Sequence, residues 1–258
     1  MAEVKPTLIL IHGAWHTPNT YSKFTTALKL AGYEVHVPAL PSMNQARPPN
    51  ADLYTDTALI RSYVESLIDA GRTVVAIMHS YGGMVGTNAL CGLGVEQRSA
   101  LGLAGGVSHL IYICGFALAE GQSIMTVIKN LDDEDRVRNS LAIEDDGTSV
   151  YPDPRGRLIG EDVAGASEAE IEQYVLTLGR WNAAATCQEL AGCAWKEIPV
   201  SYIHATQDLP VPMVWQKDMV EKMRAQGREV QAVELNTGHC PNLTMTEAVV
   251  AEIEKFIA

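Results

Sequence analysis

Largely apolar runs alternate along the chain with segments in which apolar residues recur at helical spacing. Four runs have the composition of strands covered on both faces of a sheet, at residues 7–11, 74–78, 109–114 and 200–204. Two further short strands are expected at residues 33–37 and 229–235. Helical spacing is found between the strands, at residues 17–31, 52–70, 212–226 and 246–257. Since parallel neighbours need crossover connections, the alternation predicts an α/β fold with a mostly parallel, doubly wound sheet.

This alternation is interrupted at residues 119–196 by helical stretches and acidic turns without another continuous apolar strand. Residues 167–170 have the spacing of a capping box, and residues 148–159 are expected to form a short hairpin. The pattern predicts an α/β core at residues 1–118 and 197–258 and an inserted helical cap, or lid, at residues 119–196. Additional helical packing is the plainer alternative, but an insertion between two sheet strands is suited to lining a substrate pocket.

Composition places the chain among globular proteins. It has 258 residues, of which 47% are hydrophobic and 19% are charged, enough for one large domain or a core with an insertion. Its 19 lysines and arginines face 31 aspartates and glutamates, so the formal net charge is -12 at pH 7. This acidity argues against nucleic acid or an anionic membrane as a partner, and it carries no information about a substrate.

The N-terminal residues and the cysteines together predict a cytoplasmic protein. Residues 1–6 lead directly into a short apolar strand, which is too short and wrongly flanked for a signal peptide. No segment of the sequence approaches the length of a membrane helix. The five cysteines form no paired framework and no tight metal spacing, and an odd number suits a reducing compartment.

The stretch at residues 74–86 is the first candidate for chemistry. An apolar strand ends at Ser80, and a pair of glycines then opens a segment with helical spacing. In a nucleophile elbow, the reactive serine stands at such a strained turn with its hydroxyl above the sheet. The usual motif reads Gly-x-Ser-x-Gly, but Met78 stands at the first small position and is expected to fill space behind the turn. An ordinary strand-to-helix connection with an exposed serine is the alternative.

Two further residues at strand ends, Asp208 and His239, complete a candidate triad with Ser80. The carboxyl ends of parallel strands face the same side of a sheet, so the three residues are expected to meet there, in the chain order of the elbow-type triad. A serine hydroxyl needs an imidazole to take its proton, and a buried carboxylate holds that imidazole in the useful tautomer. Ser80 is the expected nucleophile, His239 the base and then the acid, and Asp208 the residue that orients it. A turn aspartate and a loop histidine are the alternatives.

The turn after the first strand is a candidate for the second half of an oxyanion hole. Its sequence His-Gly-Ala is expected to present the backbone N–H of Ala14, while the elbow presents that of Tyr81. His79 is expected to pack and form hydrogen bonds rather than act as a second base, and Trp181 and Met213 are candidates for either pocket or core. The seven histidines contain no His-Glu-x-x-His pattern, so no metal is expected. Substrate-binding residues are expected close to the motif ends, at Trp15, His16 and Phe116.

These motifs resemble the α/β-hydrolase superfamily over nearly the whole chain. The resemblance is carried by residues 7–15, 79–84, 116–123, 200–208 and 238–239. Within the superfamily they are similar to the small esterase branch that includes plant methyl-ester esterases acting on salicylate and jasmonate, and the hydroxynitrile lyases. The resemblance implies a cofactor-free serine hydrolase with a helical cap, which cleaves a small carboxylic ester or lactone through an acyl-enzyme. It places Ser80, Asp208 and His239 on the triad, and it places Ala14 and Tyr81 on the oxyanion donors.

One departure from this family narrows the chemistry, and two other functions stay open. The lyases carry a lysine directly after the catalytic histidine, where this chain has Cys240, so cyanohydrin cleavage is disfavoured. The same triad could instead break or rearrange a C–C bond in a specialised metabolite, with His239 as a base and no acyl-enzyme. A non-catalytic small-molecule receptor is the third hypothesis. The closing helix could contribute to a homodimer, although packing on the sheet explains its apolar stripe.

Overall fold

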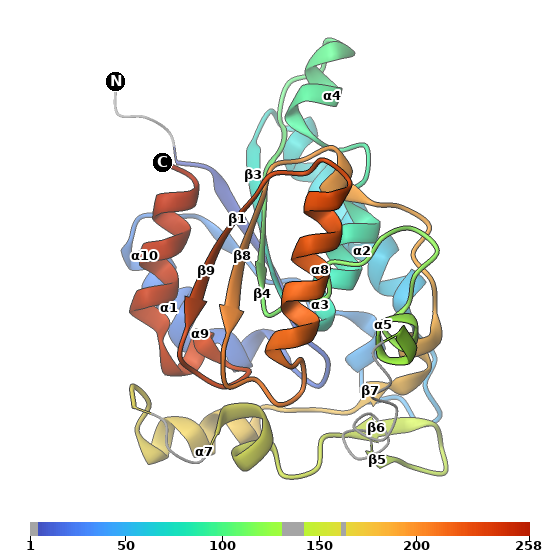
Figure 1. Ribbon diagram of the computed structural model, residues 1–258, viewed down its shortest axis with the longest axis vertical. Coiled ribbons are helices and arrows are strands. Elements are labelled where there is room, and N and C mark those ends of the chain that lie inside the picture. Colours follow the sequence, from blue (N-terminus) through green and yellow to red (C-terminus); the bar gives the residue numbers. More distant parts are fainter. Residues whose placement is uncertain (1–4, 131–141, 161–163) are drawn as a thin grey trace.

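A six-stranded parallel sheet forms the centre of the molecule (Figure 1). The computed structural model describes residues 5–130, 142–160 and 164–258. The strands follow the order β2–β1–β3–β4–β8–β9, and every neighbouring pair is parallel, so the predicted α/β fold is confirmed. Their bounds are Thr7–Ile11 for β1, Val35–His36 for β2, Thr73–His79 for β3, Gly106–Ile113 for β4, Val200–Ala205 for β8 and Val230–Leu235 for β9.

Helices cover both faces of this sheet, which is therefore buried on both sides (Figure 1). On one face lie α1 (Ser22–Leu30) and α10 (Thr246–Phe256), and on the other α2 (Leu53–Asp69), α3 (Tyr81–Ala89) and α8 (Met213–Ala225). Successive side chains of a strand point to opposite faces. Ile9 and Ile11 accordingly belong to one hydrophobic core, and Leu8 and Leu10 to the other. The continuous apolar run of β1 reflects this double burial.

The segment between β4 and β8 lies across the carboxyl ends of the strands, along the lower edge of Figure 1. Its described elements are α5 (Ile124–Asn130), β5 (Ala142–Ile143), β6 (Thr148–Val150), η3 (Arg155–Ile159), α7 (Glu168–Leu176), β7 (Trp181–Asn182), η4 (Ala183–Cys187) and η5 (Ala194–Lys196). The strands β5, β6 and β7 form a small antiparallel sheet. The capping box of α7 is confirmed, because Ser167 and Glu170 each accept the backbone N–H of the other. The division of the chain into core and cap at residues 119 and 196 stays a prediction.

The hairpin predicted at residues 148–159 is wrong. The reversal lies earlier, at residues 144–147, where Gly147 has a φ of 83° and its N–H donates to the carbonyl of Glu144 at 2.9 Å. Residues 155–159 form a helical turn instead. The prolines in this stretch are typical of a turn between two strands. Pro154 instead precedes the helical turn as its N-cap, a place that proline tolerates.

Short elements without a periodic signal were also absent from the sequence-based prediction. They are η2 (Pro41–Met43), α4 (Val95–Ala100) and α9 (Pro241–Thr244). The helix predicted at residues 17–31 begins with the short helical turn η1 (Pro18–Tyr21). The strand expected at residues 33–37 is reduced to β2, which pairs with β1 at Val35 and His36. An edge strand is paired on one side only and presents unpaired N–H and C=O groups on the other side. Because β2 is short, it presents few such groups.

The helix α3 approaches the sheet closely because its first two turns contain glycines. A Cβ atom at Gly82 would lie 2.1 Å from the carbonyl oxygen of Ile11, and one at Gly86 would lie 2.3 Å from the Sδ atom of Met78. Met78 is fully buried in the core behind the turn, as expected from its sequence position. The absent side chain of Gly86 provides the room that this bulky residue needs.

We expect the substitution Gly86→Ala to destabilise the protein by about 1–3 kcal/mol, because the new methyl group overlaps the Met78 side chain. Met78→Ala alone should cost about 2–5 kcal/mol through the cavity that it leaves. In that background Gly86→Ala should cost less, since its closest overlap, with Met78 Sδ, is gone and alanine favours a helix over glycine by roughly 1 kcal/mol, while Ile11 Cδ1 still lies 2.9 Å from the new methyl group. Urea unfolding of the four proteins measures both effects. An equal effect of Gly86→Ala in both backgrounds would contradict this packing.

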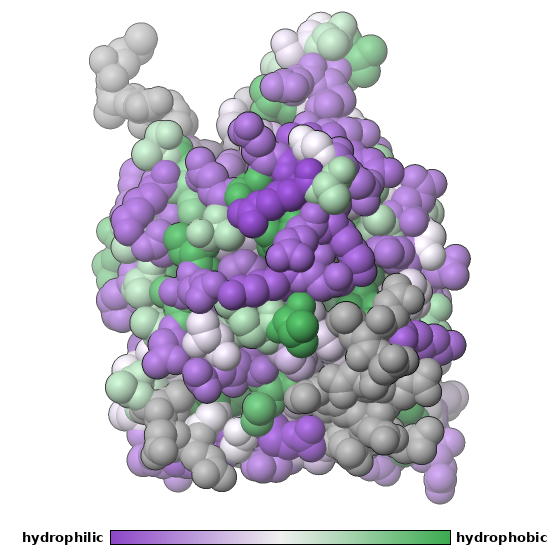
Figure 2. All heavy atoms as spheres, in the orientation of Figure 1, coloured by the Kyte–Doolittle hydropathy of each residue, from purple (hydrophilic) through white to green (hydrophobic). Residues whose placement is uncertain are grey.

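The face shown in Figure 2 is largely hydrophilic, with hydrophobic residues dispersed among polar and charged ones. Leu101 and Leu103, which follow α4, are among the exposed large hydrophobic residues, at 75% and 48% exposure. Across the described parts of the chain, every helix is too short or too polar to cross a membrane. The homodimer and the cytoplasmic location stay predictions.

Candidate active site

Ser80 stands at the sharp turn between β3 and α3. Its φ of 54° and ψ of -124° lie in a region that residues with a side chain rarely adopt. Backbone hydrogen bonds hold this conformation. The N–H of Ser80 donates to the carbonyl of Ile113 at 3.2 Å, and its own carbonyl accepts the N–H groups of Gly83 and Phe116 at 2.9 and 3.0 Å. The turn therefore presents the hydroxyl at the carboxyl edge of the sheet, as in a nucleophile elbow.

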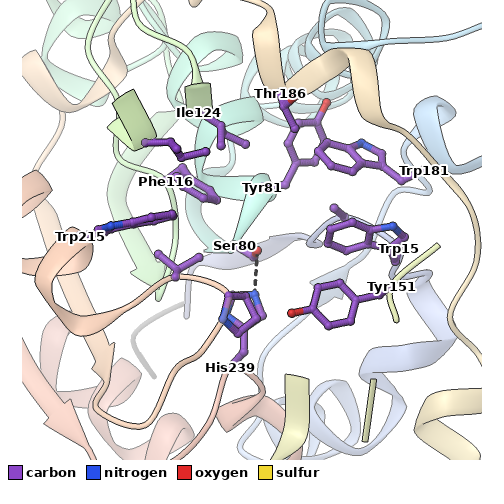
Figure 3. Close-up of a pocket in the computed structure, with 14 residues that line it drawn as sticks. Trp15, Ser80, Tyr81, Phe116, Ile124, Tyr151, Trp181, Thr186, Trp215 and His239 are labelled. Atoms are coloured by element: carbon purple, nitrogen blue, oxygen red, sulfur yellow. Dashed lines mark hydrogen bonds between the residues drawn. The ribbon is translucent and has the colours of Figure 1, made fainter. Parts of the chain in front are cut away.

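Ser80, His239 and Asp208 form a continuous hydrogen-bonded chain, so the structure brings together the three residues that the sequence predicts to meet. His239 Nδ1 lies 2.7 Å from Asp208 Oδ2, and His239 Nε2 lies 2.8 Å from Ser80 Oγ (Figure 3). A carboxylate only accepts, so the proton sits on Nδ1 and leaves Nε2 free to accept from the hydroxyl. The three residues are buried, with exposures of 5%, 2% and 5% in the same order.

Two further hydrogen bonds fix the Asp208 carboxylate. Its Oδ1 accepts the backbone N–H of Val211 at 2.7 Å, and its Oδ2 accepts from the side-chain amide of Gln216 on α8 at 3.4 Å. Gln216 is fully buried and also bonds the backbone N–H and carbonyl of Ala205, both at 3.0 Å. The end of β8 and the first turn of α8 thus position the carboxylate together.

Two backbone N–H groups beside the cavity are candidates for an oxyanion hole. Ala14 and Tyr81 line the same cavity as Ser80 and are 3% and 1% exposed. Within the described residues, no hydrogen bond occupies the backbone N–H of either residue. Trp15, the next residue after Ala14, has a φ of 62°, which bends the chain sharply beside the cavity. The role of this pair as oxyanion donors stays a prediction.

His12 shapes the turn that carries Ala14. Its Nδ1 donates to the carbonyl of Gly13 at 3.0 Å, while its Nε2 accepts the backbone N–H of Leu40 at 3.1 Å. Burial lowers the pKa of His12 to about 4, so the ring is neutral near pH 7. Its tautomer then follows from its partners, since an N–H donor needs an acceptor nitrogen.

His79 connects this turn with the loop of His239. The hydroxyl of Tyr21 accepts the N–H of Gly13 at 3.1 Å and donates to His79 Nδ1 at 2.6 Å. His79 Nε2 donates to the backbone carbonyl of His239 at 2.7 Å. Burial holds the pKa of His79 well below its usual range, so the ring stays neutral. His79 is a packing and hydrogen-bonding residue, as the sequence predicts, and both its nitrogens are engaged.

His16 does not line the cavity, contrary to the expectation that it contacts substrate. Its Nδ1 donates to the carbonyl of Ala14 at 2.7 Å, and its Nε2 accepts from the hydroxyl of Tyr174 on α7 at 2.8 Å. Burial lowers the pKa of His16 to about 3. Its place in the sequence beside the oxyanion turn suggested the pocket, but the turn directs its side chain behind Ala14. His16 joins that turn to α7 instead.

The cavity in front of Ser80 is lined mainly by aromatic rings (Figure 3). They belong to Trp15, Tyr81, Phe116, Tyr151, Trp181 and Trp215. About 540 Å³ of space within this cavity and its opening to solvent is not occupied by atoms. Trp15 packs edge-on against Tyr151 and Trp181, with ring centroids 4.9 and 5.1 Å apart. Among the described residues that line the cavity there is no Asp, Glu, Lys or Arg.

The sequence located part of this lining. Trp15 and Phe116 line the cavity as expected, and so does Trp181, whereas Met213 does not. Several lining residues were not identified from the sequence, namely Ile124, Ile128, Tyr151, Thr186, Pro210, Val211 and Trp215. Trp215 has helical spacing on α8, and this spacing does not distinguish a cavity residue from a core residue. Tyr151 follows β6 in the segment that the wrongly placed hairpin covered.

One group of potential metal ligands occurs in the described part of the chain, made of His79, Cys114 and His239 with ligand atoms within 4.8 Å. The histidine nitrogens are engaged in the hydrogen bonds above, and burial holds the pKa of the Cys114 thiol well above its usual range. Burial also raises the pKa of Cys240 to about 12, so this residue is a neutral thiol where the lyases carry lysine. The absence of a metal and of a cofactor stays a prediction.

Comparisons with known proteins agree with the fold. The model of the alpha/beta hydrolase family matches residues 8–252. A protein of Phoma sp. described as probable hydrolase R7 is 28% identical over 255 residues, covering 96% of this chain and 98% of its own. The crystal structure of a pyrethroid hydrolase from Sphingobium faniae superposes with a TM-score of 0.72 at 20% identity, covering 98% and 97% of the two chains. A polyneuridine aldehyde esterase mutant superposes with a TM-score of 0.71 at 14% identity, covering 98% and 99%.

Proposed function

The chain belongs to the alpha/beta hydrolase family, and on that premise we propose that it is a cofactor-free serine hydrolase that cleaves a small carboxylic ester or lactone through an acyl-enzyme. The observation that carries this proposal is the chain of hydrogen bonds from Asp208 through His239 to Ser80, which ends at the floor of the cavity. The names of the similar proteins, hydrolase and esterase, support the same reaction class.

In the first half of the reaction, Ser80 Oγ attacks the ester carbonyl while His239 Nε2 takes the hydroxyl proton. The negative charge that develops on the carbonyl oxygen is met by the N–H groups of Ala14 and Tyr81. Asp208 stabilises the imidazolium that His239 has become and keeps its Nδ1–H directed at the carboxylate. The tetrahedral intermediate then collapses, and His239 returns the proton to the departing alcohol.

In the second half, a water molecule takes the place of the alcohol. His239 Nε2 removes a proton from this water, which attacks the acyl carbonyl, and the same two N–H groups meet the second oxyanion. Collapse returns the proton to Ser80 Oγ and releases a carboxylic acid. With a lactone, the alcohol and the acid leave as one hydroxy acid.

Partitioning of the acyl-enzyme tests this pathway. Esters that share one acyl group but differ in their alcohol are hydrolysed in buffer that contains methanol. Once the alcohol has left, the acyl-enzyme is identical for all of these substrates. The ratio of methyl ester to free acid should therefore be the same for every substrate. A ratio that changes with the leaving alcohol would exclude a common acyl-enzyme. Ser80→Ala supplies the background ratio.

The described residues that line the cavity include no Asp, Glu, Lys or Arg, and we expect from this a preference for uncharged substrates. A carboxylate bound against aromatic rings loses water without gaining a cation, which is costly. We expect kcat/KM for p-nitrophenyl hemisuccinate at pH 8 to be at least about tenfold below that for p-nitrophenyl pentanoate, which has a similar length and no charge. Equal values for the two esters would contradict the lining described above.

A further inference from the structure

Asp56 is a fully buried carboxyl group that the reaction above does not use. It lies in the first turn of α2 and is 0% exposed. Throughout the described residues, no Lys, Arg or His forms an ion pair with it. A buried carboxylate without a cation is unfavourable, so hydrogen bonds must compensate its charge.

Three hydrogen bonds converge on this carboxylate, and one comes from the active site. Oδ1 accepts the backbone N–H of Ser42 at 2.8 Å. Oδ2 accepts both the hydroxyl of Ser42 at 2.5 Å and the phenol of Tyr81 at 2.8 Å. Tyr81 supplies the candidate oxyanion N–H through its backbone, and its ring is part of the cavity wall. Asp56 therefore holds the phenol hydroxyl of Tyr81, the residue whose backbone N–H is the candidate oxyanion donor.

The same short loop serves both halves of the candidate oxyanion hole. Ser42 binds Asp56 through its N–H and its hydroxyl. Two residues earlier, the N–H of Leu40 donates to Nε2 of His12, which shapes the turn that carries Ala14. The loop at residues 40–42 is thus connected to Tyr81 by Asp56 and to the Ala14 turn by His12.

We propose that Asp56 is a positioning residue, whose carboxylate holds the Tyr81 phenol and thereby orients the Tyr81 backbone N–H and the aromatic wall beside Ser80. This inference rests on the proposed function for its catalytic meaning. The ring of Tyr81 is also packed against Trp181, with ring centroids 5.0 Å apart. A tyrosine fixed at its hydroxyl, its ring and its backbone has little freedom to move its N–H away from an oxyanion.

The ionisation of Asp56 makes this connection sensitive to pH. Burial raises its pKa to about 6, and the bonds from Ser42 and Tyr81 oppose that shift. Of the titratable groups around it, Tyr81 stays protonated because burial holds its pKa well above its usual range, and Asp52 on α2 adds a repulsive negative charge. His12 beyond the loop is neutral.

The raised pKa fixes the sign of two effects. Below pH 6 the carboxyl binds a proton and loses its charge, so the hydrogen bond that it accepts from the Tyr81 phenol weakens. Folding stability runs the other way. A carboxyl whose pKa is higher in the folded than in the unfolded chain favours folding at low pH, and this contribution is lost as the pH rises through about 6. Removing the charge should therefore not lower the thermal stability at pH 8.

The amide of Tyr81 gives a readout that needs no turnover. In protein labelled with ¹⁵N-tyrosine, the Tyr81 amide resonance is identified by its absence in Tyr81→Phe. We expect its chemical shift in the wild type to change with a midpoint near pH 6, and the change to disappear in Asp56→Asn. A titration that survives unchanged in Asp56→Asn, or no titration in the wild type, would overturn the connection.

Kinetics with an uncharged ester test the catalytic consequence. We expect Asp56→Asn and Tyr81→Phe each to lower kcat by about 10- to 100-fold with little change in KM, because a misplaced oxyanion donor weakens the transition state. The double variant should have a kcat no lower than that of either single variant, because all three variants lose the same hydrogen bond between Asp56 and Tyr81. In the wild type, kcat should also fall by about 10- to 100-fold as the pH drops through about 6, and this step should be absent in both variants, because protonation of Asp56 weakens the same contact that each substitution removes.

The outcomes separate the two proposals. A step near pH 6 that persists in both variants, or a kcat within twofold of the wild type, would overturn the positioning role. A lower kcat accompanied by a lower melting temperature at pH 8 in both variants, with the step near pH 6 unchanged, would assign Asp56 to structure alone and also overturn it. If the wild type hydrolyses no ester while the Tyr81 amide still follows Asp56, the proposed function fails and the connection between the two residues stands.

Discussion

Replacement of Ser80 by alanine is expected to lower kcat for ester hydrolysis by roughly 10⁵- to 10⁶-fold. The hydroxyl is the only side-chain group of Ser80 that the proposed reaction uses, and its Oγ lies 2.8 Å from His239 Nε2. Without it, His239 has no proton to take, and only the oxyanion donors and the cavity remain to assist attack by water. KM should change little, because the cavity wall that holds the substrate keeps its aromatic rings. Initial rates with phenyl acetate measure both parameters.

A matched control separates nucleophilic attack from a general effect of losing a serine. Ser108 in β4 bonds the backbone carbonyl of Val74 at 3.3 Å, away from the cavity, and Ser108→Ala should retain wild-type rates. The alanine variant of Ser80 should also unfold at the wild-type temperature or higher, because the substitution removes no packing contact of the hydrophobic core. Full turnover by Ser80→Ala on a substrate that the wild type converts would favour C–C chemistry with His239 as the base.

Replacement of Asp208 by asparagine should lower kcat by about 10⁴-fold. The amide group of asparagine would present a donor to His239 Nδ1 where the carboxylate accepts at 2.7 Å. The proton of the imidazole would then move to Nε2, and the ring could no longer take the proton of Ser80. The loss should appear in kcat with little change in KM, since Asp208 does not line the cavity. Steady-state kinetics at pH 8 measure the effect.

The matched control for this change is Asp218→Asn. Asp218 pairs with Lys222 on the surface of α8 at 2.6 Å, and exposed pairs of this kind contribute little. Its removal should leave kcat within about twofold of the wild type. A loss below tenfold in Asp208→Asn would mean that another acceptor holds His239, and it would remove Asp208 from the proposed triad.

The sequence was informative about the reacting groups because their signals are local. Ser80, Asp208 and His239 each follow a predicted strand, and parallel strands bring such ends to one edge of a sheet. The two turns that carry Ala14 and Tyr81 follow strands in the same way. Met78 departs from the usual motif, but its consequence was also local: the missing side chain of Gly86 makes room for it.

The walls of the cavity could not be predicted in the same way, because they depend on how distant segments pack. Tyr151 and Trp215 have no signature that distinguishes a cavity residue from a core residue. His16 stands next to the right turn, yet the direction of its side chain is set by Tyr174, which is 158 positions away along the chain. Asp56 has helical spacing like its neighbours, and its contact with Tyr81 appears only once α2 and α3 are packed together.

The central claim is that Ser80 is a nucleophile activated by His239, and covalent labelling tests it most directly. The protein is incubated with a fluorophosphonate, and intact mass spectrometry and peptide mapping follow the adduct. We predict one phosphonyl group per chain on the peptide that contains Ser80, none on Ser80→Ala, and strongly slowed labelling of Asp208→Asn. A well-folded wild-type protein that stays unlabelled, or that carries the label at another residue, would contradict the account.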